Sequence, residues 1–178
     1  FLTIKVDGAE TANNYYIGTD PATGATALQG KAFGTVTSLQ ISGCDMKYWS
    51  DTQDRTGGSF YYKITNTANN TDIVSATEII WDQQALGGND FHGTKATTID
   101  LLAGLPSGSY QLHVWAKSWG STDGDSWLSN NSSNYVATFT KAFPTGSMSG
   151  VYTVGANLTS NFASLGTAIS AVNTNGMT

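Results

Sequence analysis

Tryptophan is the residue type in this chain with the clearest potential for ligand binding. The chain has 178 residues, five of them tryptophan, and an exposed indole ring can stack on the apolar face of a sugar ring. Trp119 and Trp127 flank a turn-rich segment, while Trp115 alternates with Leu112 and Val114 along a predicted strand, which places it on the opposite face. We therefore expect Trp115, Trp119 and Trp127 to be candidates for binding a carbohydrate. The alternative is core packing, because tryptophan also supplies a large apolar area.

The segment 120–126 between two of these tryptophans carries a second kind of chemistry. Asp123 and Asp125 offer two carboxylates with a glycine between them, and Asn89 and Asp90 in another loop could add oxygen ligands. Calcium takes about six to eight oxygens, of which this segment could supply a part. The spacing differs from that of an EF-hand, and an Asx-rich turn whose side chains bond their own backbone is the alternative. Ca²⁺ is the one cofactor that the sequence suggests.

Evidence for catalysis is weak. Asp45, Asp51 and Asp54 cluster around Trp49 and Arg55, and two carboxylates held about 5 to 10 Å apart could hydrolyse a glycoside. Nothing in the sequence sets such a distance, so solvated loop charges are the favoured interpretation. The two histidines are separated by a strand and a corner, and no nucleophile-elbow, zinc-protease or phosphate-loop motif occurs. We expect a protein that is not an enzyme.

The elements that must position these residues are predicted to be strands. Apolar and polar residues alternate in short runs, and Gly, Asn, Asp and Ser gather in the segments between them. About seven or eight short strands of this kind favour an antiparallel β-sandwich, with a closed barrel as the alternative. The runs lie at 2–6, 36–41, 59–65, 76–81, 97–101, 110–116 and 135–139.

One corner makes the fold class more specific. A strand ends near Leu101, a Pro106-Ser107-Gly108 turn follows, and Tyr110 begins the next strand. In Greek-key sandwiches of the immunoglobulin or fibronectin type, a tyrosine at this place bonds back to the upstream backbone. The sequence therefore predicts an all-β, antiparallel Greek-key sandwich, with Tyr110 facing the core. Many functions share this architecture.

The character of the sequence changes after residue 143. Residues 144–150 are rich in Pro, Gly and Ser and are typical of a linker. A short strand is expected at 151–154, and apolar residues at 162, 165, 169 and 172 have helical spacing. We interpret 1–143 as the sandwich module and 151–178 as the start of a next domain or a docked appendage.

The amino-acid composition of the chain limits the kinds of partner that it can bind. Only 12% of residues are charged and the net charge is −5, which disfavours nucleic acid because phosphate binding needs clustered Lys and Arg. No stretch approaches the about 18 apolar residues of a membrane span. The single cysteine, Cys44, cannot form an internal disulfide and is expected to be a small buried residue.

Two sets of motifs resemble a known family. The runs 150–155, 162–165 and 168–173 resemble the start of a module in large secreted proteins of Bacteroidota that use the type IX secretion route. The sandwich from Leu2 to Lys141 also resembles an accessory module of these proteins, through 104–110, 124–131 and 135–139. The resemblance implies a secreted or cell-surface location in a bacterium and a multidomain parent, and it carries over no catalytic residue.

The residues and the family resemblance together favour two different kinds of function. The first is a structural or adhesive surface module, whose partners would be other copies of itself, as in a filament, or neighbouring surface domains. The second is a carbohydrate-binding module of a secreted polysaccharide-degrading enzyme, which the tryptophans favour.

Overall fold

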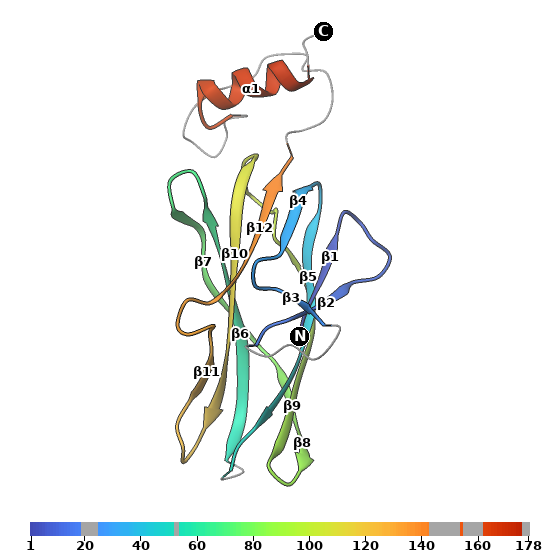
Figure 1. Cartoon of the computed structure of the whole chain (residues 1–178), viewed down its shortest axis with the longest axis vertical. Coiled ribbons are helices and arrows are strands. Elements are labelled where there is room, and N and C mark those ends of the chain that lie inside the picture. Colours follow the sequence, from blue (N-terminus) through green and yellow to red (C-terminus); the bar gives the residue numbers. More distant parts are fainter. Residues whose placement is uncertain (19–24, 52–53, 143–153, 155–161, 176–178) are drawn as a thin grey trace.

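In a computed structural model the chain forms two β-sheets packed face to face, and the structure describes residues 1–18, 25–51, 54–142, 154 and 162–175 (Figure 1). We call them sheet A, ordered β3-β2-β1-β5-β9-β8, and sheet B, ordered β4-β12-β10-β6-β7 with β11 paired to β10. The strands of sheet A are β1 (Leu2–Val6), β2 (Asn13–Tyr16), β3 (Thr26–Ala27), β5 (Leu39–Trp49), β8 (Asp82–Gly87) and β9 (Asp90–Asp100). Those of sheet B are β4 (Ala32–Val36), β6 (Arg55–Asn66), β7 (Thr71–Ile80), β10 (Gly108–Gly120), β11 (Ser126–Leu128) and β12 (Tyr135–Lys141).

The predicted all-β sandwich is confirmed, but its sheets are mixed. Most neighbouring strands run antiparallel, whereas β4 pairs in parallel with β12 and β2 pairs in parallel with β3. The expectation of a wholly antiparallel fold is wrong at these two edges. Short segments such as β3 are held by pairing with distant strands, which local periodicity cannot show. The Greek-key connection stays a prediction.

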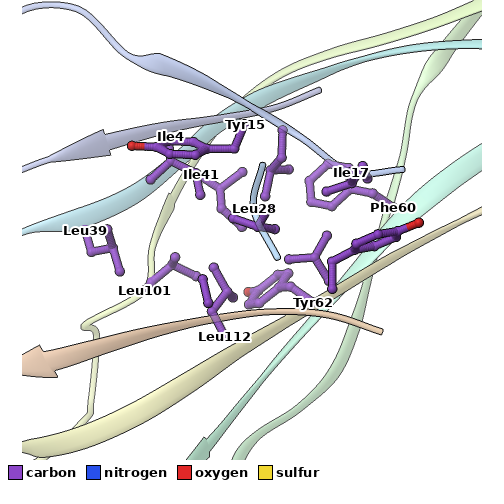
Figure 2. Close-up of a cluster of buried hydrophobic side chains, with 14 of the residues drawn as sticks. Ile4, Tyr15, Ile17, Leu28, Leu39, Ile41, Phe60, Tyr62, Leu101 and Leu112 are labelled. Atoms are coloured by element: carbon purple, nitrogen blue, oxygen red, sulfur yellow. The ribbon is translucent and has the colours of Figure 1, made fainter. Parts of the chain in front are cut away.

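Alternation along the strands sends apolar side chains into the space between the sheets (Figure 2). On β10, Tyr110, Leu112 and Val114 are completely buried, as predicted, while Trp115 lies on the other face with partial exposure. Leu2, Ile4, Leu39 and Ile41 meet them from sheet A and Phe60 and Ile64 from sheet B.

The predicted tyrosine corner is present. The Tyr110 hydroxyl donates a 2.7 Å hydrogen bond to the Pro106 carbonyl oxygen, and its ring stacks on Phe139 with centroids 5.5 Å apart. Because the Tyr110 side chain is fully buried, this bond satisfies a hydroxyl that solvent cannot reach. The corner thereby fixes how the chain crosses from β9 to β10.

Cys44 is buried, as expected, and burial raises the pKa of its thiol to about 11. A thiol of this kind stays protonated at neutral pH, and protonated thiols are poor nucleophiles. Cys44 therefore acts as a small core residue.

The C-terminal part contains the predicted helix, α1 (Leu165–Asn175). Ser164 caps it: the Ser164 hydroxyl accepts a 3.2 Å hydrogen bond from the Thr167 amide, and the Thr167 hydroxyl accepts one from the Ser164 amide. The linker 144–150 and most of the strand 151–154 lie outside the described residues. No helix in the described part of the chain is long and apolar enough to span a membrane.

The corner yields a stability prediction. Replacing Tyr110 with Phe removes the hydroxyl and its hydrogen bond to the Pro106 carbonyl, so we expect the free energy of unfolding to fall by about 0.5 to 1.5 kcal/mol. Urea unfolding followed by fluorescence measures this change. Tyr16→Phe is the control, since the Tyr16 ring packs against Phe1 and the structure shows no hydrogen bond from its hydroxyl to a described residue. A loss for Tyr110→Phe no larger than for the control would contradict the assignment.

Candidate functional site

Trp81 connects the two sheets behind the candidate site. It is the single residue between β7 of sheet B and β8 of sheet A, and its ring lies between the backbones of Gly58 and Gly93. A Cβ atom on Gly58 would come within 2.1 Å of the ring, and one on Gly93 within 2.5 Å. The Trp81 amide also donates a 3.1 Å hydrogen bond to the Gly58 carbonyl. Both glycines are therefore required by the space that the indole occupies.

Further aromatic and amide groups fix this end of the sandwich. The Tyr48 ring stacks on Phe91 with centroids 5.8 Å apart and lies 5.6 Å from the Trp81 ring. Its hydroxyl donates to the Gln83 side-chain carbonyl, and the Gln83 amide donates a 2.7 Å hydrogen bond to the Arg55 carbonyl. Burial raises the pKa of Tyr48. These contacts link β5, β8 and β6.

The outer face of sheet B carries a group of three rings, which we call the outer aromatic cluster: Tyr61, Trp115 and Trp127. Strand register places Tyr61 of β6 directly opposite Trp115 of β10, and their rings are parallel within 5° with centroids 5.4 Å apart. The Trp127 ring of β11 lies 6.0 Å from that of Tyr61. Trp127 is 56% exposed. The cluster therefore presents aromatic surface to solvent.

Charged groups border the cluster. The Glu78 carboxylate accepts hydrogen bonds from the Tyr61 hydroxyl and, at 2.7 Å, from the Ser59 hydroxyl, and these bonds lower the pKa of Glu78. Lys117 forms a 2.6 Å ion pair with Asp125, which raises the pKa of the lysine. The Lys117 Nζ atom also lies 4.8 Å from the centroid of the Trp127 ring, within the range of a cation–π interaction. Hydrogen-bond donors and acceptors thus surround an aromatic surface.

Two of the three predicted ligand-binding tryptophans, Trp115 and Trp127, meet in this cluster, and the third packs nearby. Trp119 covers Gly57, where an added Cβ would lie 2.7 Å from the ring, and it stays partly exposed. Tyr61 was missed by the sequence analysis. Its alternation with buried Phe60 and Tyr62, together with Trp115 on a neighbouring strand, is the signal that could have found it.

The loop that carries Asp123 and Asp125 is held by a buried ion pair. The Asp54 carboxylate accepts hydrogen bonds from the Thr122 and Asp123 amides at 2.6 and 2.8 Å, and Arg55 donates to the Gly124 carbonyl at 2.8 Å. The side chains of Asp54 and Arg55 are only 4% and 6% exposed and form an ion pair with each other. Of the three aspartates interpreted as solvated loop charges, Asp54 is therefore buried, and the interpretation is wrong for this residue.

The other predicted calcium ligands, Asn89 and Asp90, already have polar partners. Asp90 forms a 3.6 Å ion pair with Lys47, and the Asn89 side-chain amide donates to the Asp51 carbonyl at 3.4 Å. No group of three or more His, Cys, Asp or Glu residues placed to hold a metal ion occurs among the described residues. Calcium binding at Asp123, Asp125, Asn89 and Asp90 stays a prediction.

The two histidines lie in different sheets. His92 of β9 contacts the Asp45 carboxylate at 2.8 Å, whereas His113 lies on the outer face of β10, where burial lowers its pKa. They do not form a metal pair.

No protein-family model matches the chain, and a search of curated proteins finds no significant match. The resemblance to modules of Bacteroidota surface proteins therefore stays a prediction.

The position of Trp81 yields a second stability prediction. We expect Gly58→Ala and Gly93→Ala each to lower the free energy of unfolding by about 1 to 3 kcal/mol, because the new methyl group must displace the indole ring. Thermal and urea unfolding measure the change. Gly166→Ala in α1 is the matched control, since the nearest atom to its added Cβ is 3.7 Å away. Unchanged stability of both core variants would show that the sheets do not depend on this contact.

Proposed function

We propose that the chain is a non-catalytic carbohydrate-binding module, and that the outer aromatic cluster is its binding surface. The observation that carries the proposal is the meeting of Tyr61, Trp115 and Trp127 on one exposed sheet face. Stacking on aromatic rings covers the C–H faces of a sugar, and the surrounding hydroxyl groups of the sugar need hydrogen-bond partners. Lys117, Glu78 and Asp125 supply these partners at the border of the cluster.

The rigidity of the cluster supports this proposal. Tyr61 is held from two sides, by the stacked Trp115 ring and by the hydrogen bond to Glu78, and Lys117 is held by Asp125. Groups that are already ordered lose little conformational entropy when a ligand binds. Pre-organised side chains on adjacent strands can therefore bind a ligand without rearrangement of the sheet.

The low fraction of charged residues and the resemblance to Bacteroidota modules support placing this module in a secreted or cell-surface bacterial protein that has further domains. A glycan-binding module in such a protein would bring a catalytic or adhesive neighbour to a polysaccharide.

A structural or adhesive role is the second candidate, and one observation favours it. Strand β7 forms an edge of sheet B, is ten residues long, and exposes Ile73 and Ile80. Long edge strands with exposed apolar residues can pair with another chain. The occupant would then be the edge of a second copy, as in a filament.

The carbohydrate proposal is tested by affinity electrophoresis and pull-down on a panel of polysaccharides that includes cellulose, xylan, mannan, chitin and pectin. We expect retention on at least one of them, and a loss of affinity of about thirtyfold for Trp127→Ala, the size of effect typical of a central aromatic residue. Leu86→Ala, an exposed residue of sheet A, is the control and keeps wild-type affinity. Retention by none of the polysaccharides, or equal retention of Trp127→Ala, would contradict the proposal.

Self-association through β7 is tested by sedimentation velocity at increasing protein concentration. We expect larger species in the wild type that disappear in the double variant Ile73→Lys and Ile80→Lys, because lysines on an edge strand oppose pairing with a second strand. A wild type that remains monomeric at every concentration rules this candidate out.

A further inference from the structure

A cavity of about 210 Å³ opens between the two sheets beside the outer aromatic cluster. Residues of β5 in sheet A and of β10 and β11 in sheet B contribute to it, together with Trp81 from the crossover between the sheets. Its walls include the aromatic residues Tyr48, Trp49, Trp81 and Trp127. Trp49 and Trp127 are 61% and 56% exposed, so the cavity is accessible to solvent.

The innermost tryptophan contributes aromatic surface to the cavity. Trp81 is only 5% exposed, and its indole nitrogen is buried beside Gly93, where an added Cβ atom would lie 2.5 Å from it. The Tyr48 ring packs against the same indole with centroids 5.6 Å apart. A ligand in the cavity would therefore meet the ring of Trp81 and find its hydrogen-bond partners among the polar groups that line the cavity.

The charges at the cavity are balanced. Lys47 and Lys117 both line it, and each forms an ion pair, Lys47 with Asp90 at 3.6 Å and Lys117 with Asp125 at 2.6 Å. The two lysines therefore do not present an excess of positive charge to an anionic ligand. Paired lysines and carboxylates offer both donors and acceptors, which suits the hydroxyl groups of an uncharged ligand.

Trp127 connects the cavity with the outer aromatic cluster, because it lines the cavity and also lies against Tyr61. A ligand that fills the cavity and continues past Trp127 would meet the cluster next. A glycan chain has this form, since its last ring can enter a cavity while the following rings lie on a surface.

We propose that the cavity binds the terminal pyranose ring of an uncharged glycan, and that the outer aromatic cluster binds the rings that follow. The inference rests on the proposed carbohydrate-binding function and adds the place where the chain end is bound. Trp49 and Trp127 provide aromatic contact at the opening, and the Trp81 ring provides apolar contact inside the cavity. The module would accordingly prefer chain ends to the interior of a long chain.

The test uses the indole N–H signals of the five tryptophans in ¹⁵N-labelled full-length chain. Methyl glycosides of glucose, galactose, mannose, xylose and N-acetylglucosamine serve as probes of a single ring. We expect at least one of them to shift the signals of Trp49 and Trp81 and to leave that of Trp115 unchanged. Single substitutions to Phe assign the signals.

Two variants measure the contributions of the cavity. Trp81→Phe replaces the indole with a smaller ring and so removes part of the aromatic surface inside the cavity, and we expect it to weaken binding of the glycoside about tenfold. Trp49→Ala changes an exposed residue, should fold normally and should also weaken binding. Leu86→Ala remains the control with wild-type affinity. Equal affinity of Trp49→Ala and the wild type overturns the inference, even if Trp81→Phe fails to fold.

The outcomes separate the two proposals. If polysaccharides are retained but no glycoside shifts Trp49 or Trp81, the cavity inference is wrong and the proposed function stands. If a Gly-Trp dipeptide shifts these signals and no glycoside does, the cavity binds a peptide side chain and the inference is also wrong. If neither polysaccharide nor glycoside binds, both proposals fail.

Discussion

The placement of Trp81 between Gly58 and Gly93 is the constraint on which the site depends. The indole fills the space between the two sheets at the point where the chain passes from β7 to β8. Packed interiors tolerate neither an added atom nor a void at such a position. Because Gly58 belongs to β6 and Gly93 to β9, one side chain sets the separation of both sheets at this end. That separation in turn determines the width of the cavity that Trp81 lines.

The five tryptophans occupy different environments because the strands direct them differently. Trp81 is internal, Trp119 packs on a glycine, and Trp115 stacks on Tyr61. Trp49 and Trp127 remain largely exposed. The last two are unusual, since exposing a large aromatic surface gives up the free energy that its burial would contribute. An exposed aromatic surface beside a cavity and between ion pairs is the arrangement that the proposed glycan-binding role requires.

Local patterns predicted those parts of the structure that depend on neighbours in sequence. The alternation of Leu112, Val114 and Trp115 predicted which side chain faces outward, and the Pro106 to Tyr110 segment predicted the corner. Helical spacing predicted α1. The burial of Asp54 and Arg55 could not be predicted, because it arises when the loop 121–125 folds back onto them from about seventy residues further along the chain. The parallel edge pairs and the cavity beside Trp49 and Trp81 depend in the same way on contacts between distant strands.

The most direct test of the account is a crystal structure of the chain grown with a mixture of short cello-, xylo-, manno- and chito-oligosaccharides. Our account predicts a sugar chain whose rings lie against Trp127 and the outer aromatic cluster, with one end next to Trp49 and Trp81. An oligosaccharide bound only elsewhere on the sandwich, or no bound sugar at saturating concentration, would contradict it.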